Sequence, residues 1–333
     1  MTIRIALLGA GRIGQVHALT ISRLNTVRLV AVADAFADAA NNIAETYGCE
    51  IRTNEEIETA QDVDAVLICT PTDTHADLIE RFARAGKAIF CEKPVDLDVD
   101  RVRQCLKVAA EYDDRLMIGF NRRFDPHFAE LKRSITDGKL GEIEQITIIS
   151  RDPGLPPHSY IAVSGGIFRD MTVHDFDMAR HLLGEKLTSV SATASALIDP
   201  SIRDLDDFDT ASVVMMTESG KQVTIINSRR ATYGYDQRIE VHGSLGMIRA
   251  ENQRPVSVEF ADVFGFTRPP LHDFFMTRYL AAYEAELTSF IQALTTGAPM
   301  SPNGQDGLAA MLIAEAALAS VKQDRTVQLS DIA

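Results

Sequence analysis

The sequence predicts an α/β fold in which a doubly wound parallel sheet is followed by an α+β domain with a large, mostly antiparallel open sheet. Up to about residue 120, short and almost wholly apolar runs alternate with helical stretches, which is typical of parallel strands covered by helices on both faces. After that point, longer runs alternate apolar and polar residues, as antiparallel strands with one buried face do.

The first domain is expected to cover residues 1–120. Its strands are predicted where the apolar runs lie, at residues 3–8, 28–34, 64–70, 87–93 and 115–120. Helices are expected after the first strand and at residues 36–47, 75–86 and 98–111. Since strand–helix–strand connections in parallel sheets are right-handed, this order predicts a doubly wound domain.

The second domain is expected to cover residues 121–333. It opens with a predicted helix at 126–137 and closes with two long helices at 277–295 and 304–321. Between them lie the alternating runs that predict strands, at residues 142–151, 189–198, 210–219, 222–231 and 237–244. The polar face of this sheet must either meet solvent or pair with another subunit.

Composition argues against several classes of function. The chain has 333 residues, of which 33 are basic and 47 acidic, and its formal net charge is −14. This acidic balance argues against nucleic acid as a partner, and no apolar run approaches the roughly 18 residues of a membrane span. The four cysteines stand apart without a CxxC pair, which predicts neither a disulfide framework nor a metal site and fits a reducing cytoplasm.

A glycine-rich loop follows the first predicted strand and opens a helix. Residues 9–14 read GAGRIG, the GxGxxG pattern of dinucleotide-binding folds. In such a loop Gly9 permits the tight turn, Gly11 lets the backbone approach a pyrophosphate, and Gly14 lets helix and strand pack closely. The exposed N–H groups at the start of the helix would then hold the phosphates.

The second predicted strand ends in an acidic residue that bears on the choice of cofactor. Asp34 stands 20 residues after the last glycine of the loop, where a carboxylate accepts hydrogen bonds from ribose hydroxyls and repels a 2′-phosphate. The spacing therefore predicts NAD rather than NADP. Arg12 lies with Ile13 in the phosphate turn and not after the second strand, so it leaves this prediction unchanged.

Polar side chains end the third and fourth predicted strands. Thr70, Pro71 and His75 belong to the segment TPTDTH, in which the histidine is expected to cap a helix. Glu92 and Lys93 belong to the segment CEKP, at the sheet edge where ligands of open parallel sheets bind. An ammonium there can stabilise negative charge that develops on a substrate hydroxyl, and the proline that follows can hold a cis or otherwise fixed peptide. The alternative is a surface lysine followed by a turn proline.

A carboxylate and an imidazole lie four residues apart in a predicted helix that ends near residue 184. If Asp170 and His174 are both helical, they share a face, and the carboxylate would orient the imidazole and raise its basicity, as a general base requires. The alternative is an acidic helix start with a structural histidine. His17, His75 and His242 have no partner at a comparable spacing.

Two further segments carry side chains suited to an oxygen-rich ligand. NRRFD contains Arg122 just after the last strand of the first domain, and YGYDQ contains Tyr235 between two predicted strands of the second. Arginine donors and tyrosine hydroxyls can bind a polyol. A structural arginine and a hairpin turn are equally compatible with these segments.

Together these motifs resemble the Gfo/Idh/MocA family of NAD(P)-dependent sugar and polyol dehydrogenases. The resemblance covers nearly the whole chain, and its segments occur in the expected order: GAGRIG, TPTDTH, CEKP, GFNRRFD, DMTVHDFD and YGYDQRIEVHG. Within the family, the chain is most similar to the myo-inositol 2-dehydrogenases. The resemblance implies an N-terminal Rossmann domain that binds NAD, and a homotetramer assembled through the open face of the large sheet.

The resemblance also implies roles for the matching residues. Lys93 would contact the reacting hydroxyl, His174 would be the general base and Asp170 its orienting carboxylate. The substrate-binding residues would be Lys93, Arg122, Asp152, Asp170, His174 and Tyr235. Asp152 falls where some inositol dehydrogenases carry asparagine, which bears on the preferred isomer. The cofactor-binding residues would be Gly9, Gly11, Arg12, Ile13, Gly14, Asp34, Thr70, Pro71, His75, Glu92 and Lys93.

The reaction implied by the resemblance is the NAD-dependent oxidation of myo-inositol at C2 to 2-keto-myo-inositol (scyllo-inosose), with hydride transfer to C4 of the nicotinamide. One alternative is a dehydrogenase of another polyol or aldose, such as scyllo-inositol, D-chiro-inositol or a hexose, since the lysine, aspartate and histidine chemistry is shared. The other is a cofactor-binding regulator that has lost catalysis, against which the presence of all three residues argues.

Overall fold

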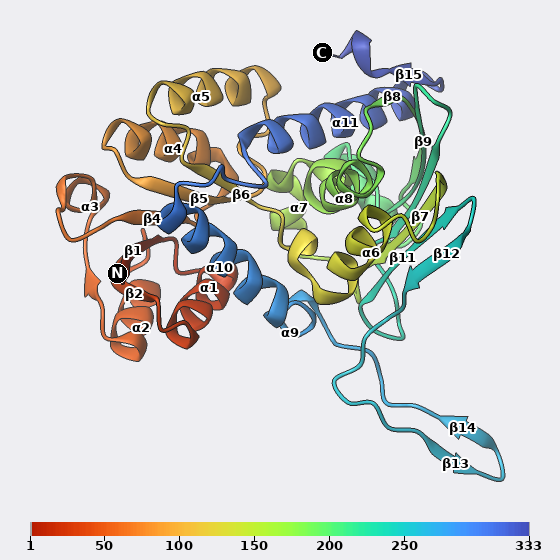
Figure 1. Ribbon diagram of the computed structural model, residues 1–333, viewed down its shortest axis with the longest axis horizontal. Helices are drawn as coiled ribbons and strands as arrows, with labels where there is room; N and C mark the ends of the chain where they lie inside the picture. The colour runs from red at the N-terminus through yellow and green to blue at the C-terminus, as the bar shows by residue number, and fades with distance from the viewer. Residues whose placement is uncertain (1, 333) are drawn as a thin grey trace. The chain divides into compact units, whose positions relative to one another are not determined.

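The computed structural model describes residues 2–332, which form two compact units (Figure 1). The first unit comprises Met1–Asp125 and Leu280–Met311, and the second comprises Pro126–Tyr279 and Leu312–Ala333. Each unit is built around one large sheet. The division into domains at residue 120 stays a prediction, but by packing the segment 280–311 belongs with the first unit.

Within the described part of the first unit, six parallel strands form the sheet, of which five lie where the apolar runs predict strands and one, β3, is not predicted. They follow the order β3-β2-β1-β4-β5-β6. Along the chain, β2 and β3 are added on one side of β1, and β4, β5 and β6 are then added on its other side, as in doubly wound folds. Strands β1, β4, β5 and β6 are almost wholly buried, as expected between two layers of helices. The strand bounds are Ile3–Leu8 (β1), Val27–Ala33 (β2), Glu50–Ile51 (β3), Ala65–Ile68 (β4), Ala88–Glu92 (β5) and Leu116–Gly119 (β6).

Helices connect these strands and begin at residues suited to helix starts. Helix α1 opens directly at the glycine loop, with Gly11 as its N-cap, and Asp98 caps α5 by accepting backbone hydrogen bonds. Thr53 and Glu56 form a capping box at the start of α3, in a segment for which the sequence predicts no element. The helix bounds are Arg12–Arg23 (α1), Ala37–Tyr47 (α2), Asn54–Thr59 (α3), His75–Arg84 (α4) and Val99–Glu111 (α5).

In the described part of the second unit, seven strands form the large sheet, in the order β12-β11-β7-β10-β9-β8-β15. Only β7 and β10 pair in parallel, whereas the other neighbours are antiparallel. The predicted fold class, with its mostly antiparallel open sheet, is therefore confirmed. The strand bounds are Ile143–Arg151 (β7), Leu187–Ser195 (β8), Thr210–Thr217 (β9), Gln222–Ser228 (β10), Asp236–Gly243 (β11), Gly246–Ala250 (β12) and Val327–Gln328 (β15).

The helices of the second unit cover the buried face of this sheet. Helix α8 (Val173–Leu183) packs against β7 and against α6 (Pro126–Thr136). A π-helical turn, Phe168–Thr172, runs directly into α8. A shorter helix, α7 (His158–Ser164), precedes that turn. The face opposite these helices carries the outward-pointing residues of the strands.

The predicted helix at 277–295 is divided into α9 (Phe275–Arg278) and α10 (Leu280–Thr296). The break falls at Tyr279, whose backbone has φ −110° and ψ 20° and is not helical. Helix α10 packs along α1, and Phe290 meets Phe90 of β5 edge to face with ring centroids 5.8 Å apart. The last long helix, α11, covers Gly304–Gln323.

A hairpin that the sequence does not predict extends from the second unit. Strands β13 (Phe260–Asp262) and β14 (Gly265–Thr267) form a two-stranded sheet of their own, and Figure 1 shows them clear of the large sheet. The hairpin is apolar but open to solvent, since Phe264 is 95% exposed and Val263 is 93% exposed.

Within residues 2–332, no helix is both long and apolar enough to cross a membrane. Over the same residues, no group of three or more histidine, cysteine and acidic side chains is placed to hold a metal ion. All four cysteines are free thiols, and burial raises the pKa of Cys69 and of Cys91.

Candidate active site

The glycine loop joins β1 to α1 with very little room around two of its glycines. Gly9 has φ +96°, which strains other residues, and a Cβ there would lie 2.6 Å from the carbonyl carbon of Cys69. A Cβ on Gly14 would lie 2.0 Å from the carbonyl oxygen of Gly9. By contrast, no described atom lies within 4 Å of the Cβ position of Gly11, so the start of α1 is open to an anionic ligand.

Asp34 is tied to the glycine loop by its carboxylate. Its Oδ2 accepts a hydrogen bond from the backbone N–H of Ala10 at 2.6 Å, and its Oδ1 accepts one from Phe36 at 2.7 Å. These bonds hold the carboxylate at the end of β2, where the ribose of a dinucleotide lies in folds of this type. Arg12 and Ile13 form the first turn of α1, and Arg12 is exposed.

A buried histidine connects the carboxyl ends of β4 and β5. His75 is the first residue of α4 and is only 1% exposed. Its Nδ1 lies 2.7 Å from the carbonyl oxygen of Pro94, and its Nε2 lies 2.8 Å from that of Thr70. The histidine therefore bonds to strand ends rather than capping its own helix. Pro71 is exposed and precedes the 3-10 turn Thr72–Thr74.

Lys93 directly follows β5, and its peptide bond to Pro94 is cis. The preceding residue, Glu92, is 9% exposed, and its Oε1 lies 2.7 Å from Nε2 of His17 on α1. The sequence offers His17 no partner at the spacing of Asp170 and His174, and its partner in the structure lies 75 residues away in the chain. The partner of His242 is also distant in sequence, since its Nδ1 lies 3.2 Å from a glutamate on the neighbouring strand.

Arg122 lies at the end of the last parallel strand. It belongs to a 3-10 turn, Asn121–Phe124, that follows β6 and packs against α10. Its side chain is 5% exposed, so this is a buried guanidinium rather than a surface arginine. Buried charged groups need compensating partners, which makes a structural or a binding role equally compatible with its position.

Asp170 and His174 lie on one continuous helical stretch. Asp170 belongs to the π-helical turn, whereas His174 belongs to the first turn of α8. The four residues from Asp170 to His174 therefore include the point at which the wider π-helical turn becomes a regular α-helix. Such π-helical turns inside helices occur frequently at functional sites.

Two side chains that the sequence does not single out hold Asp170 in place. Its Oδ1 accepts a hydrogen bond from the hydroxyl of Tyr160 at 2.8 Å, and its Oδ2 accepts one from Nη1 of Arg229 at 3.2 Å. Arg229 is 1% exposed, and its Nη2 lies 3.8 Å from Oδ2 of Asp207. Burial raises the pKa of Asp207, an effect that the guanidinium opposes. One buried cation therefore lies between two carboxyl groups.

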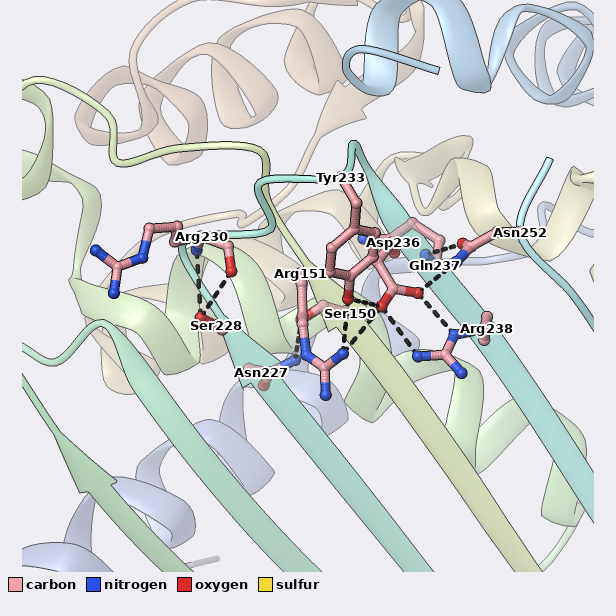
Figure 2. A network of polar contacts seen from close by, with 10 residues as sticks. All are labelled: Ser150, Arg151, Asn227, Ser228, Arg230, Tyr233, Asp236, Gln237, Arg238 and Asn252. Carbon is pink, nitrogen blue, oxygen red and sulfur yellow. Dashed lines mark hydrogen bonds and ion pairs between the residues drawn. The ribbon is translucent and has the colours of Figure 1, made fainter. Parts of the chain in front are cut away.

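A polar network fixes the segment next to Tyr235 (Figure 2). Asp236, the first residue of β11, is fully buried. It accepts hydrogen bonds from the side chains of Tyr233, Arg151, Arg238 and Asn252. Burial acts to raise the pKa of Asp236, but these hydrogen bonds outweigh burial and lower it. The ionised carboxylate therefore holds the ends of β7 and β11 together.

Tyr235 itself lies inside an aromatic cluster. It is 5% exposed, and its ring centroid lies 5.7 Å from that of Phe274 and 6.0 Å from that of Tyr279. Asp152 is partly exposed, and its backbone N–H donates to the carbonyl oxygen of Ser228 at 2.9 Å. The substrate contacts expected of Tyr235 and Asp152 stay predictions.

Predicted site residues occur in both units. In the first unit, the predicted cofactor-binding residues gather at the carboxyl ends of β1, β2, β4 and β5, the edge where open parallel sheets bind ligands. In the second unit, Tyr160 and the buried Arg229 both donate hydrogen bonds to the Asp170 carboxylate. His174 lies four residues further along the same helical stretch, and an imidazole is suited to proton transfer. Three residues that sequence reasoning missed, His17, Tyr160 and Arg229, each bond to a predicted site residue.

Sequence comparison finds relatives over the full length of the chain. Residues 3–120 match the oxidoreductase family with an NAD-binding Rossmann fold (GFO/IDH/MocA), and residues 128–249 match the GFO/IDH/MocA C-terminal domain. The chain is 64% identical over 330 residues to the inositol 2-dehydrogenase of Rhizobium meliloti (strain 1021). That alignment covers 99% of this chain and 100% of the relative.

Solved structures show the same arrangement of elements. A myo-inositol dehydrogenase from Corynebacterium glutamicum superposes with a TM-score of 0.95 at 43% identity, covering 99% of both chains. A scyllo-inositol dehydrogenase from Lactobacillus casei, with bound NAD(H) and scyllo-inositol, superposes with a TM-score of 0.92 at 27% identity. The second comparison covers 99% of this chain and 100% of the other.

Proposed function

Since this chain belongs to the Gfo/Idh/MocA family of oxidoreductases, we propose that it oxidises myo-inositol at C2 to 2-keto-myo-inositol with NAD as hydride acceptor. The observation that carries the proposal is 64% identity, over 99% of the chain, to an inositol 2-dehydrogenase. The family resemblance, the NAD-binding Rossmann domain and the assignment as a polyol dehydrogenase are confirmed.

The chemistry is divided among Lys93, His174 and Asp170. Lys93 donates a hydrogen bond to the C2 hydroxyl and stabilises the negative charge that grows as the hydroxyl loses its proton. His174 accepts that proton, and Asp170 orients the imidazole. NAD, when bound, accepts at C4 the hydride that leaves C2, so the C–H and O–H bonds break while the carbonyl forms. The place of Lys93 at the ligand edge of the sheet and the bonds that fix Asp170 support these roles.

Arg122, Asp152 and Tyr235 are assigned to the remaining hydroxyls of the polyol. Arg122 follows β6 at the carboxyl-end edge of the parallel sheet, and the several N–H donors of its guanidinium are suited to ligand oxygens. Asp152 accepts hydrogen bonds from hydroxyls and adds a negative charge, so it influences which stereoisomer is preferred. A network centred on Asp236 fixes the segment next to Tyr235.

The experiment that tests this function is NADH formation, followed by absorbance, with a panel of polyols. The panel contains myo-inositol, scyllo-inositol, D-chiro-inositol, glucose and xylose, each with NAD. The highest kcat/KM is expected with myo-inositol. A higher kcat/KM with scyllo-inositol or with a sugar would change the proposed substrate but leave the proposed type of reaction unchanged. No turnover with any substrate, together with tight NADH binding, would favour the non-catalytic regulator.

We also propose that the protein is a cytoplasmic homotetramer assembled through the open face of its large sheet. On that face, Val214 and Met216 of β9 are 44% and 40% exposed. Apolar side chains gathered on an exposed face are typical of surfaces that another subunit covers. The free thiols fit a reducing compartment.

Introducing charge on the open face is expected to break the tetramer into smaller species. The double substitution Val214→Glu and Met216→Glu places two carboxylates where a dry contact is proposed, and burying an unpaired charge is costly. Native mass spectrometry measures the result. Ile51→Glu, an equivalent change at an exposed residue of the first unit, serves as the control. An unchanged tetramer in the double variant would place the interface elsewhere.

Replacing Asp34 is expected to weaken the preference for NAD over NADP. In Asp34→Ser the 2′-phosphate of NADP no longer meets a carboxylate, and like-charge contacts cost several kcal/mol. The ratio of kcat/KM for the two cofactors should fall by roughly 10- to 100-fold. Asp34→Asn removes the charge but keeps one accepting oxygen, so it can still accept a hydrogen bond from the backbone N–H of either Ala10 or Phe36, and comparing it with Asp34→Ser helps to separate the effect of charge from that of loop structure. If the ratio stays the same in both variants, another residue discriminates.

A further inference from the structure

Two buried histidines hold the residues on either side of Lys93. Glu92, the residue before it, is bonded to His17, and Pro94, the residue after it, is bonded to His75. The two histidines come from different helices, α1 and α4. They are 0% and 1% exposed. Burying a polar side chain costs free energy unless it is hydrogen-bonded, so packing alone does not explain why two histidines are buried here.

His17 fixes the Glu92 side chain in a defined orientation. Its ring packs edge-on against Phe90 and Tyr283, with centroids 5.2 Å and 5.5 Å away. Among the described residues, no group forms a hydrogen bond with Nδ1 of His17, so the ring proton belongs on Nε2, which donates to Glu92 at 2.7 Å. On its other side, the Glu92 carboxylate lies against the bare backbone of Gly119, where a Cβ would come within 3.0 Å.

His75 fixes the backbone rather than a side chain. Its two ring nitrogens lie within hydrogen-bond distance of the carbonyl oxygens of Thr70 and Pro94. Burial lowers the pKa of His75, so near pH 7 the ring is neutral and carries a single N–H. It therefore donates to one carbonyl at a time, yet its place between them sets the separation of the two strand ends.

We propose that His17 and His75 are positioning residues that together direct the Lys93 ammonium at the reacting hydroxyl. The inference rests on the proposed function, in which that ammonium contacts the C2 hydroxyl. A lysine side chain has four rotatable bonds, so its aim depends on a fixed backbone and fixed neighbours. A displacement of about 1 Å at a reacting group can cost on the order of 100-fold in rate. Neither histidine touches the reacting atoms.

The test is a double-mutant cycle with Lys93. His17→Leu and His75→Leu are each expected to lower kcat by roughly 10- to 100-fold, with NADH affinity changed by less than about threefold. In a Lys93→Ala background, the same substitutions are expected to cause no further loss, because residues acting through one group are not additive. Rates are measured with myo-inositol and with its C2-deuterated form. The isotope effect on kcat should rise as hydride transfer becomes slower.

Conservative variants separate positioning from structural support. His17→Gln keeps a side-chain N–H near the Glu92 carboxylate and is expected to recover most of the kcat lost in His17→Leu. If His17→Leu does not fold, Glu92→Gln replaces it, since this change weakens the bond between His17 and Glu92 while keeping the shape of the side chain. It should give a smaller loss of kcat and again no further loss without Lys93. His242→Gln, at a half-exposed pair, is the control and should keep wild-type kcat.

Several results would overturn the proposal. A loss of kcat that is fully additive with Lys93→Ala would mean that the histidines act independently of the lysine. A loss confined to NADH affinity would indicate cofactor binding, which the family resemblance implies for His75, and not positioning of Lys93, and unchanged kinetics would leave both histidines without a role. A wild-type protein that does not oxidise inositol would instead contradict the proposed function, before any variant is compared.

Discussion

The variant Lys93→Ala is expected to oxidise myo-inositol with a kcat lower by on the order of 1,000-fold. In the proposed mechanism the ammonium stabilises the negative charge that grows as the hydroxyl loses its proton, and an alanine side chain carries no charge to do so. NADH affinity should stay within a few-fold of wild type, because the glycine loop and Asp34 remain intact. Steady-state kinetics measure the first quantity, and NADH fluorescence titration measures the second.

Lys107→Ala is the matched control for this experiment. Lys107 is an exposed lysine on α5, and its loss should leave both kcat and NADH affinity unchanged. Unchanged turnover in Lys93→Ala would remove Lys93 from the chemistry and would return the non-catalytic regulator to consideration. A loss of NADH affinity as large as the loss of kcat would instead make Lys93 a cofactor-binding residue.

Five of the six strands of the first unit could be predicted because their signals are local. An apolar run such as Ile3–Leu8 is typical of a strand covered on both faces, and the close approach of Gly14 to Gly9 occurs within one turn of chain. The short elements β3 and α3 escaped prediction because a two-residue strand has no periodicity to detect.

The partners of the candidate catalytic residues could not be predicted because they are distant in sequence. Asp170 and Arg229 are 59 residues apart, and His17 and Glu92 are 75 apart. One feature of the sequence does point to a buried partner for Arg229. Val223 and Ile225 face inward from the strand that precedes it, and Arg229 stands at the same two-residue spacing. A charged residue at an inward-facing position of a strand needs a buried partner. The identity of that partner depends on the tertiary fold.

Tyr235 illustrates a different limit of sequence reasoning. The segment YGYDQ contains two tyrosines that are equally suited to a polyol. In the structure Tyr233 is 50% exposed and bonds to Asp236, whereas Tyr235 is buried among aromatic rings. Nothing in the local pattern separates the two, because their orientations follow from where β11 begins.

The variant Arg229→Leu is expected to lose about 3–5 kcal/mol in the free energy of unfolding at pH 7. Its guanidinium lies between Asp170 and Asp207, and both carboxyl groups are largely buried. Removing the guanidinium takes away the positive charge between these two carboxyl groups. Turnover should fall as well, because Asp170, the proposed orienting carboxylate, loses the hydrogen bond that Arg229 donates to it and keeps the one from Tyr160. Urea unfolding and steady-state kinetics measure the two effects.

This loss of stability is expected to depend on pH in a defined direction. Asp207 already has a pKa above its ordinary value, and the guanidinium is the charge that counteracts this rise. Without Arg229 the folded-state pKa of Asp207 rises further. A carboxyl group whose pKa is raised by folding stabilises the folded state below its unfolded pKa of about 4, and this contribution disappears as the pH rises through the folded pKa. The destabilisation should therefore be small near pH 4 and grow towards pH 7.

A second substitution tests whether the uncompensated charge causes this effect. Arg229→Leu combined with Asp207→Asn removes one of the two buried carboxylates while keeping an oxygen that accepts from the backbone N–H of Ile167. The double variant should recover part of the lost stability and show a weaker dependence on pH. It should not recover turnover, because Asp170 still lacks its guanidinium. A destabilisation independent of pH, or recovery of turnover together with stability, would show that Arg229 acts through packing and not through its charge.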